Sequence, residues 1–176
     1  MTIALDENKV AIVIAVFNDG ANIERAIRSA VAQILPTDFS LDVLVVDDCS
    51  TDNTARIARE VCAEFDCASF IQAPENGGPS KARNIALSHS DAEWFLPLDS
   101  DDIMDPERVG KMIQIAKDQS VDIVADNLLI THADTPLEVD RVLWPDKPEG
   151  IVPVSATYFV AHSYNMPQER LSLIHI

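Results

Sequence analysis

The run Val10–Phe17 most constrains what this chain can fold into, because it is apolar on both faces and rich in β-branched residues. An amphipathic strand would alternate apolar and polar residues, whereas a strand covered on both sides, as in a parallel sheet, does not. Further segments have a similar apolar character. They predict four more strands, at Leu41–Val46, Ser69–Ala73, Trp94–Leu98 and Val121–Ile130.

Amphipathic segments separate these runs. Between Asn22 and Gln33, apolar residues recur at spacings of three and four, which predicts a helix. Further helices are expected from the capping residue Asp52 to about Phe65, from Pro79 onward, and after the capping residue Asp105. This alternation predicts an α/β fold with an open, mostly parallel sheet and helices on both faces.

Polar side chains gather where three of the predicted strands end, at Asn18-Asp19, Asp47-Asp48 and Asp99-Ser-Asp101. Ligands of such sheets bind beyond the carboxyl ends of the strands. Two carboxylates about 4 Å apart repel by about 4 kcal/mol at an effective dielectric constant near 20, so the adjoining acids Asp99, Asp101 and Asp102 need a cation or strong donors. A hard divalent ion satisfies that need, and a solvated Asp-rich turn is the alternative.

The sequence has neither G-x-G-x-x-G after the first strand nor a G-x-x-x-x-G-K-[ST] loop, so the usual phosphate cradles are missing. Carboxylates that hold Mg²⁺ or Mn²⁺ would bring a diphosphate to this acidic chain instead. The predicted helix start at Lys81, Arg83 and Asn84 is a second place where an anion is stabilised. A net charge of -16 argues against nucleic acid as a partner.

Four motifs together carry a family resemblance. They are Val10-Ala-Ile-Val-Ile-Ala-Val-Phe-Asn18, Val45-Val-Asp-Asp-Cys-Ser-Thr-Asp-Asn-Thr54, Glu75-Asn-Gly-Gly-Pro-Ser-Lys-Ala-Arg-Asn84 and Leu98-Asp-Ser-Asp-Asp102. Any one of them is weak, but their order over residues 10 to about 130 resembles glycosyltransferase family 2. The resemblance implies a Rossmann-like GT-A fold and an inverting enzyme that uses a nucleotide sugar, commonly linked to UDP.

The resemblance also implies roles for single residues. Phe17 stands where the family usually has Tyr, beneath the nucleobase, with Asn18 beside it, and Asp48 matches the acid that binds the base while Asp47 shares its strand end. Lys81, Arg83 and Asn84 match the basic helix start beside the donor, although Arg83 is equally suited to an ion pair with a strand-end acid. The metal-binding group matches Asp99, which also faces the ribose or sugar, Asp101 and Asp102.

Such enzymes transfer the sugar to an acceptor hydroxyl in a single displacement, in which a carboxylate base removes the hydroxyl proton. In the family this base lies so far beyond the D-x-D motif that it would fall past Ile176. Asp122, Asp126, Asp134 and Asp140 are candidates only by default. We therefore interpret residues 1–131 as a nucleotide-sugar-binding core and residues 132–176 as the truncated start of an acceptor-side segment.

The finer features leave alternatives open. Residues 122–129 and 141–144 resemble the subset that builds bacterial exopolysaccharide, such as the succinoglycan glucosyltransferases, whose acceptor would be a glycan or a lipid-linked saccharide. The other interpretations are a nucleotide-sugar-binding module without turnover and a sugar nucleotidyltransferase. The latter would need a Gly-rich, basic loop after the first strand, and Phe17-Asn-Asp-Gly20 is neither. No signal peptide or membrane-spanning run is seen, so we expect a cytoplasmic protein, with peripheral association at the inner face of the membrane as the alternative for the full-length protein.

Overall fold

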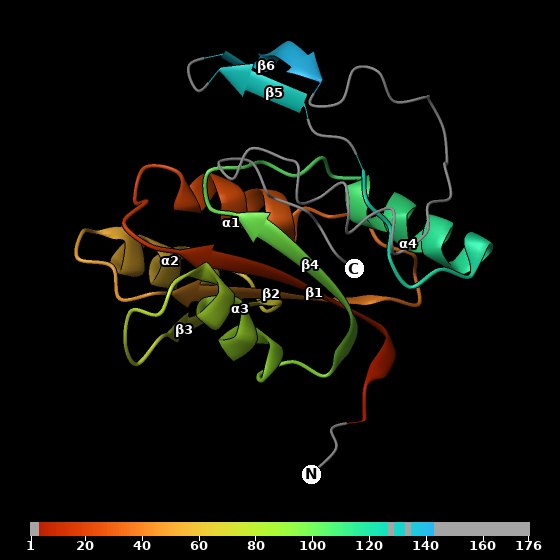
Figure 1. The fold of residues 1–176 in the computed structure, drawn as a ribbon, viewed down its shortest axis with the longest axis horizontal. Coiled ribbons are helices and arrows are strands. Elements are labelled where there is room, and N and C mark those ends of the chain that lie inside the picture. The colour runs from red at the N-terminus through yellow and green to blue at the C-terminus, as the bar shows by residue number, and fades with distance from the viewer. Residues whose placement is uncertain (1–3, 127–128, 133–134, 143–176) are drawn as a thin grey trace. The chain divides into compact units, whose positions relative to one another are not determined.

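The computed structural model describes residues 4–126, 129–132 and 135–142. By their internal contacts, the residues divide into two compact units, the first ending at Val124 and the second beginning at Ala125. The first unit holds nearly all of the described chain (Figure 1).

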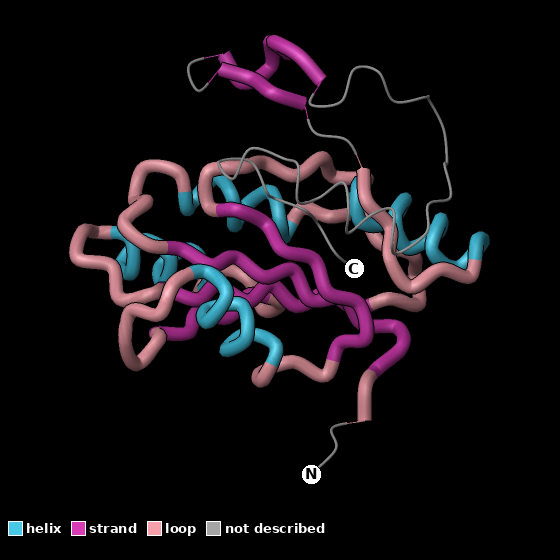
Figure 2. The backbone as a smooth tube through the Cα atoms, viewed as in Figure 1, coloured by secondary structure: helices cyan, strands magenta, loops and turns pink. Residues whose placement is uncertain are grey.

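The first unit is built on a sheet whose strands are drawn in magenta in Figure 2. The sheet has four strands, and every neighbouring pair is parallel. The order across the sheet is β3-β2-β1-β4, so the first strand lies in the interior. Residues Val10–Val16 of β1 are almost entirely buried, as their two-sided apolar pattern predicts. The strands are β1 (Asp6–Val16), β2 (Ser40–Asp47), β3 (Ala68–Gln72) and β4 (Ala92–Asp99).

Helices cover both faces of the sheet, which confirms the predicted architecture. The helices are α1 (Ile23–Val31), α2 (Thr54–Cys62), α3 (Pro79–Leu87) and α4 (Arg108–Gln119). Alternate residues of β1 point to different cores: Ile12 and Ile14 pack with α1, α2 and α4, whereas Ala11 and Val13 pack with α3. The small residues Ala82 and Ala86 let α3 lie close against its face.

The helix starts lie close to the predicted residues, but neither Asp52 nor Asp105 is the N-cap: Asn53 precedes α2 and Glu107 precedes α4. Pro79 is the first residue of α3, as expected. Asp52 accepts a hydrogen bond from the Thr54 backbone at 2.9 Å, and hydrogen bonds from the Thr54 hydroxyl and backbone lower the pKa of Asp52. Helix α4 begins at Arg108, two residues later than Pro106, because residues 106–107 form a turn in which Asp105 accepts a bond from the Glu107 N–H.

The predicted fifth strand is wrong in extent and type. Residues 121–126 are not part of a strand, and Val121 and Ile123 are exposed rather than buried. A separate antiparallel pair, β5 (Leu129–His132) and β6 (Thr135–Val142), belongs to the second unit. The acids at 122 and 126 interrupt the apolar run, which explains why it does not form a buried parallel strand. No helix among the described residues is long and apolar enough to cross a membrane.

Candidate functional site

The loops after β1, β2 and β4 are joined to one another at the carboxyl edge of the sheet. Asn18 Oδ1 accepts the Thr51 backbone N–H at 2.7 Å, and Asp19 Oδ2 accepts the Ser100 hydroxyl at 2.6 Å. The Asp19 backbone N–H also donates to Thr54 Oγ1 at 2.8 Å, at the start of α2. Three polar strand ends therefore converge, as the topology predicted.

The loop after β1 presents an aromatic ring at this edge. Phe17 is 49% exposed, which is unusual for a Phe and leaves its ring available for stacking. The next residue, Asn18, has a φ of 50°, and Cys49 in the neighbouring loop has a φ of 64°. Left-handed backbone of this kind favours Gly or Asn, so Asn18 suits its position better than Cys49 does.

Asp48 organises the loop that leads into α3. It is only 4% exposed, and its two carboxylate oxygens accept the backbone N–H groups of Gly77 at 2.9 Å and Gly78 at 2.7 Å. Gly78, the residue before α3, has a φ of 80°, a left-handed conformation that Gly adopts without strain. Both oxygens have protein donors, so the contact of Asp48 with a nucleobase stays a prediction.

The side chain of Asp47 is buried at the end of β2 and is bonded within the protein. It has no exposed surface, and its Oδ2 accepts hydrogen bonds from Gln72 Nε2 at 2.6 Å and from the Ser50 backbone at 3.0 Å. Its Oδ1 is buried without a partner among the described residues. Asp47 thus supports the loop after β2, and its assignment to donor binding stays a prediction. Nothing in the sequence pattern indicated that Gln72 would bond the carboxylate of Asp47.

The basic residues of α3 lie in different surroundings. Arg83 forms an ion pair with Asp99, with Nη2 and Oδ1 2.8 Å apart and both side chains partly buried, which is the alternative that the sequence left open for Arg83. Lys81 pairs with Glu75 in the loop before the helix, and Asn84 is exposed. The pair between Arg83 and Asp99 connects the start of α3 with the end of β4.

The acidic loop after β4 reaches solvent. Asp101 and Asp102 are exposed, and partial desolvation, together with the charges of Asp101 and Asp99, raises the pKa of Asp102 to about 6. Within the described part of the chain, no three carboxylate, His or Cys side chains form a group that could hold a metal ion. The donors still fit Mg²⁺ or Mn²⁺, because such ions bind through one or two carboxylates and complete their shell with phosphate oxygens and water.

The raised pKa of Asp102 predicts a pH dependence of stability. Because the folded state disfavours the charged form, stability is expected to fall as the pH rises from about 4 to about 6. The stability advantage of Asp102→Asn over the wild type should therefore be larger at about pH 7.5 than at about pH 5. Urea denaturation at the two pH values measures it. Asp118→Asn controls for the loss of a negative charge elsewhere on the surface, and an equal advantage of Asp102→Asn at both pH values would contradict the prediction.

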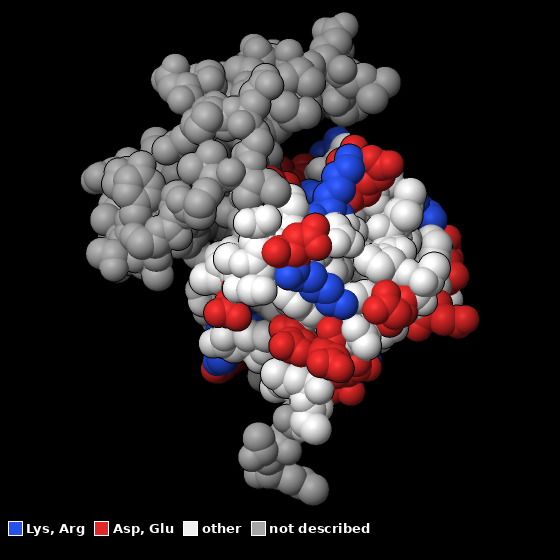
Figure 3. Space-filling view, turned by 90° about the vertical axis from the view of Figure 1, so that its right-hand side faces the viewer, with Lys and Arg blue, Asp and Glu red and all other residues white. Residues whose placement is uncertain are grey.

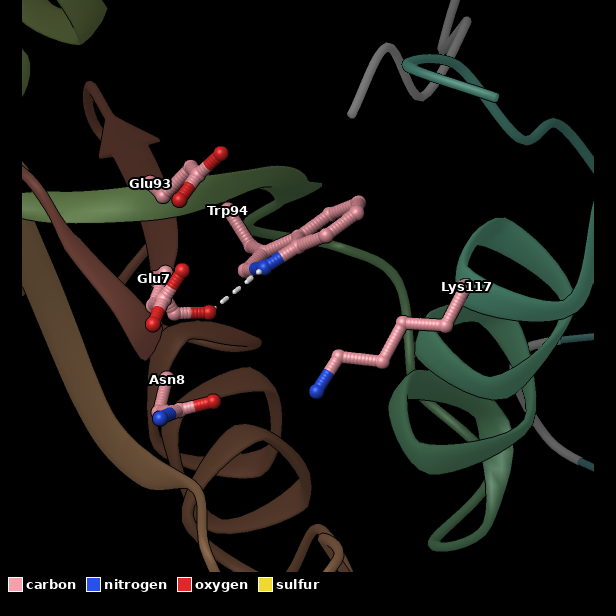
Figure 4. A pocket seen from close by; sticks show the side chains of 5 residues that line it. All are labelled: Glu7, Asn8, Glu93, Trp94 and Lys117. Carbon is pink, nitrogen blue, oxygen red and sulfur yellow. Dashed lines mark hydrogen bonds between the residues drawn. The ribbon is translucent and has the colours of Figure 1, made fainter. Parts of the chain in front are cut away.

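A pocket of about 260 Å³ lies elsewhere on the first unit. It is lined by side chains from the first residues of β1 and β4 and from α4, with Trp94 Nε1 bonded to the Glu7 carbonyl at 3.1 Å (Figure 4). It therefore lies at the amino ends of the strands, away from the carboxyl edge. On the face drawn in Figure 3, acidic side chains cover more of the surface than basic ones, in keeping with the net charge of -16.

The described part of the chain does not single out any of the default candidates as a catalytic base. Asp122 is exposed on the segment after α4, and Asp126 belongs to the second unit. Asp134 lies outside the described residues, as does the side chain of Asp140, whose backbone is part of β6. No base is therefore assigned.

A parallel α/β sheet with clustered carboxylates at its carboxyl edge defines a Rossmann-like fold, and folds of this class bind their ligands at that edge. The profile of glycosyl transferase family 2 matches residues 11–154, and the chain therefore belongs to this family. The succinoglycan biosynthesis protein ExoO of Rhizobium meliloti (strain 1021) is 35% identical over 125 residues, which cover 71% of this chain and 34% of that protein. The chain thus spans about a third of the length of this relative.

Solved structures with the same fold include two glycosyltransferases. The TarS 1–349 fragment of Staphylococcus aureus in complex with UDP-GlcNAc is 32% identical, with a TM-score of 0.56 over 70% of this chain and 34% of that one. The mannosyltransferase PcManGT of Pyrobaculum calidifontis, in complex with GDP-Man and Mn²⁺, has a TM-score of 0.61 at 24% identity, over 70% of this chain and 35% of that one. The second likeness concerns the fold alone.

Proposed function

We propose that this chain binds a UDP-linked sugar at the carboxyl edge of its sheet and is the donor-binding part of an inverting glycosyltransferase in polysaccharide or glycan synthesis. The observation that carries the proposal is the joining of the loops after β1, β2 and β4 through Asn18–Thr51 and Asp19–Ser100. These contacts gather the aromatic ring, the buried Asp48 and the acidic loop at one place in a member of family 2.

Each group has a separate part in donor binding. The exposed ring of Phe17 stacks on the uracil, while Asp48 holds the Gly77–Gly78 loop that lies beside it. The pair of Arg83 and Asp99 at the end of β4 orients the ribose or sugar. Asn84 is exposed beside the donor, and Lys81 lies at the same helix start, where it is paired with Glu75.

Asp101, with Asp99 and Asp102 beside it, would hold Mn²⁺ or Mg²⁺ against the diphosphate. Bound there, the ion stabilises the negative charge of the departing UDP. The UDP-GlcNAc complex of the 32% identical TarS fragment supports the choice of a UDP-linked donor. Support for the metal comes from the carboxylates themselves, which are hard oxygen donors.

The acceptor is a glycan or a lipid-linked saccharide, in keeping with the name of ExoO as a succinoglycan biosynthesis protein. We place the protein in the cytoplasm, at the inner face of the membrane when it meets a lipid-linked acceptor. Membership of family 2 favours sugar transfer over nucleotidyl transfer. A module that binds the donor without turnover is the second candidate, because no described residue is assigned as the base.

Calorimetric titration of the 176-residue chain with UDP tests the proposal. UDP should bind measurably with Mn²⁺ or Mg²⁺ present, and removal of the ion with EDTA should weaken binding by about 100-fold, because the diphosphate then meets uncompensated carboxylates. GDP serves as the matched control for the base. Equal UDP affinity with and without metal would refute the metal-bridged donor site, and release of UDP from UDP-GlcNAc or UDP-glucose distinguishes turnover from binding alone.

A further inference from the structure

The acidic loop after β4 is tied to the segment that begins α1 by two contacts across more than 70 positions of the chain. The Ser100 hydroxyl donates to Asp19 Oδ2 at 2.6 Å, and Arg25 Nη2 donates to the backbone carbonyl of Asp101 at 2.9 Å. The first contact holds the loop through the side chain of Ser100, and the second holds it through the backbone of Asp101. The carboxylate of Asp101 is left free, with no protein donor among the described residues.

The two contacts belong to one network. Arg25 Nη2 also donates to Asn22 Oδ1 at 3.1 Å, and Asn22 Nδ2 donates to Asp19 Oδ1 at 2.7 Å. The Asp19 carbonyl in turn accepts the backbone N–H groups of Asn22 and Ile23. The network therefore begins at Ser100 in the acidic loop and passes through Asp19 and Asn22 to Arg25. Arg25 then bonds the carbonyl of Asp101, which lies in the same loop.

Arg25 is the only cationic member of this network. Its Nε is buried without a partner among the described residues, so its guanidinium is partly desolvated beside a loop that carries three carboxylates. Like charges at such spacing repel one another and favour a loop that spreads apart. A positive charge bonded to the Asp101 carbonyl opposes that spreading, and a planar guanidinium suits two acceptors in fixed positions.

The position of Asp101 matters because a divalent ion at this edge would have few protein ligands. With one or two carboxylates contributing, affinity depends on how well each is held, and contacts behind a ligand typically change metal affinity about 10- to 100-fold. Arg28 offers a contrast, since it lies on the same helix and pairs with Glu24 at 2.8 Å and Glu64 at 3.0 Å, both exposed.

We propose that Arg25 is a positioning residue that holds the Asp101 segment through its carbonyl and thereby sets the affinity for the metal-bound nucleotide. Asp19 and Asn22 serve the same purpose by fixing Ser100 and the guanidinium. The inference rests on the proposed donor site, because it concerns how strongly that site binds. It adds to that site a residue which touches neither nucleotide nor metal.

Calorimetric titration of the full chain with UDP, with and without Mn²⁺, is the test. Arg25→Ala is expected to weaken UDP binding about 10-fold with Mn²⁺ present and less than about 2-fold without it. Arg28→Ala, the matched control on α1, should leave both affinities unchanged. In the Asp101→Ala background, Arg25→Ala should have no further effect, because residues that act through one another are not additive.

The outcomes separate this inference from the proposed function. If the wild type binds UDP equally with and without Mn²⁺, the proposed donor site fails first. If the wild type is metal-dependent, then equal losses with and without Mn²⁺ in Arg25→Ala, or a full loss in the Asp101→Ala background, overturn the role of Arg25. Should circular dichroism show that Arg25→Ala is unfolded, Arg25→Lys replaces it: the same metal-specific loss, smaller in size, supports the role, and wild-type affinity overturns it.

Discussion

Asp101→Ala is expected to remove the metal dependence of UDP binding and to lower the Mn²⁺-supported affinity by about 100-fold, equivalent to about 2.8 kcal/mol. The reason is that Asp101 is exposed at the carboxyl edge with a free carboxylate, while Asp99 is already paired with Arg83 at 2.8 Å. Removing this carboxylate deletes a proposed metal ligand that has no competing hydrogen bond or ion pair among the described residues. Calorimetry with Mn²⁺ and with EDTA measures the change.

Two controls make that result specific. Asp118→Ala removes an exposed carboxylate from α4 and should leave UDP binding unchanged. The fold of Asp101→Ala should stay intact, since the side chain makes no bond among the described residues, and its thermal midpoint is expected close to that of the wild type. A variant that still gains affinity on addition of Mn²⁺, to the same extent as the wild type, would show that the ion is held elsewhere.

Asp48→Ala is expected to destabilise the protein by about 3 kcal/mol and to weaken UDP binding at the same time. The substitution leaves the backbone N–H groups of Gly77 and Gly78 without their carboxylate acceptor at a buried position. Bonds to a charged acceptor contribute about 1.5–3 kcal/mol each, and donors left unpaired are costly. Urea denaturation followed by circular dichroism measures the loss.

Asp48→Asn provides the matched comparison. Its one carbonyl oxygen keeps one of the two acceptors, while its amide nitrogen faces the remaining N–H group, so an intermediate loss of about 1–2 kcal/mol is expected. Similar stability of the wild type and Asp48→Ala, within about 0.5 kcal/mol, would mean that the loop before α3 does not depend on this carboxylate.

Much of the fold could be predicted because its signals are local. The two-sided apolar run of β1 and the period of α1 reflect burial of the same residues that carry the pattern. The segment after α4 was predicted wrongly as a strand, since an apolar run does not show by itself which strand it pairs with. Asp122 and Asp126 within that run were the available sign against it.

The sequence alone also determined which edge of the sheet carries the acids, because parallel strands bring their carboxyl ends together whatever their lateral order. Only the tertiary structure decided which of those acids face solvent and which are used within the protein. Asp47 is buried, and Asp48 accepts the backbone N–H groups of Gly77 and Gly78. Asp99 pairs with Arg83. The backbone carbonyl of Asp101 is bonded to Arg25, while its carboxylate has no partner among the described residues. These partners lie from 16 to 76 positions apart, and contacts at such separations depend on how helices pack on the sheet, for which a local pattern contains no signal.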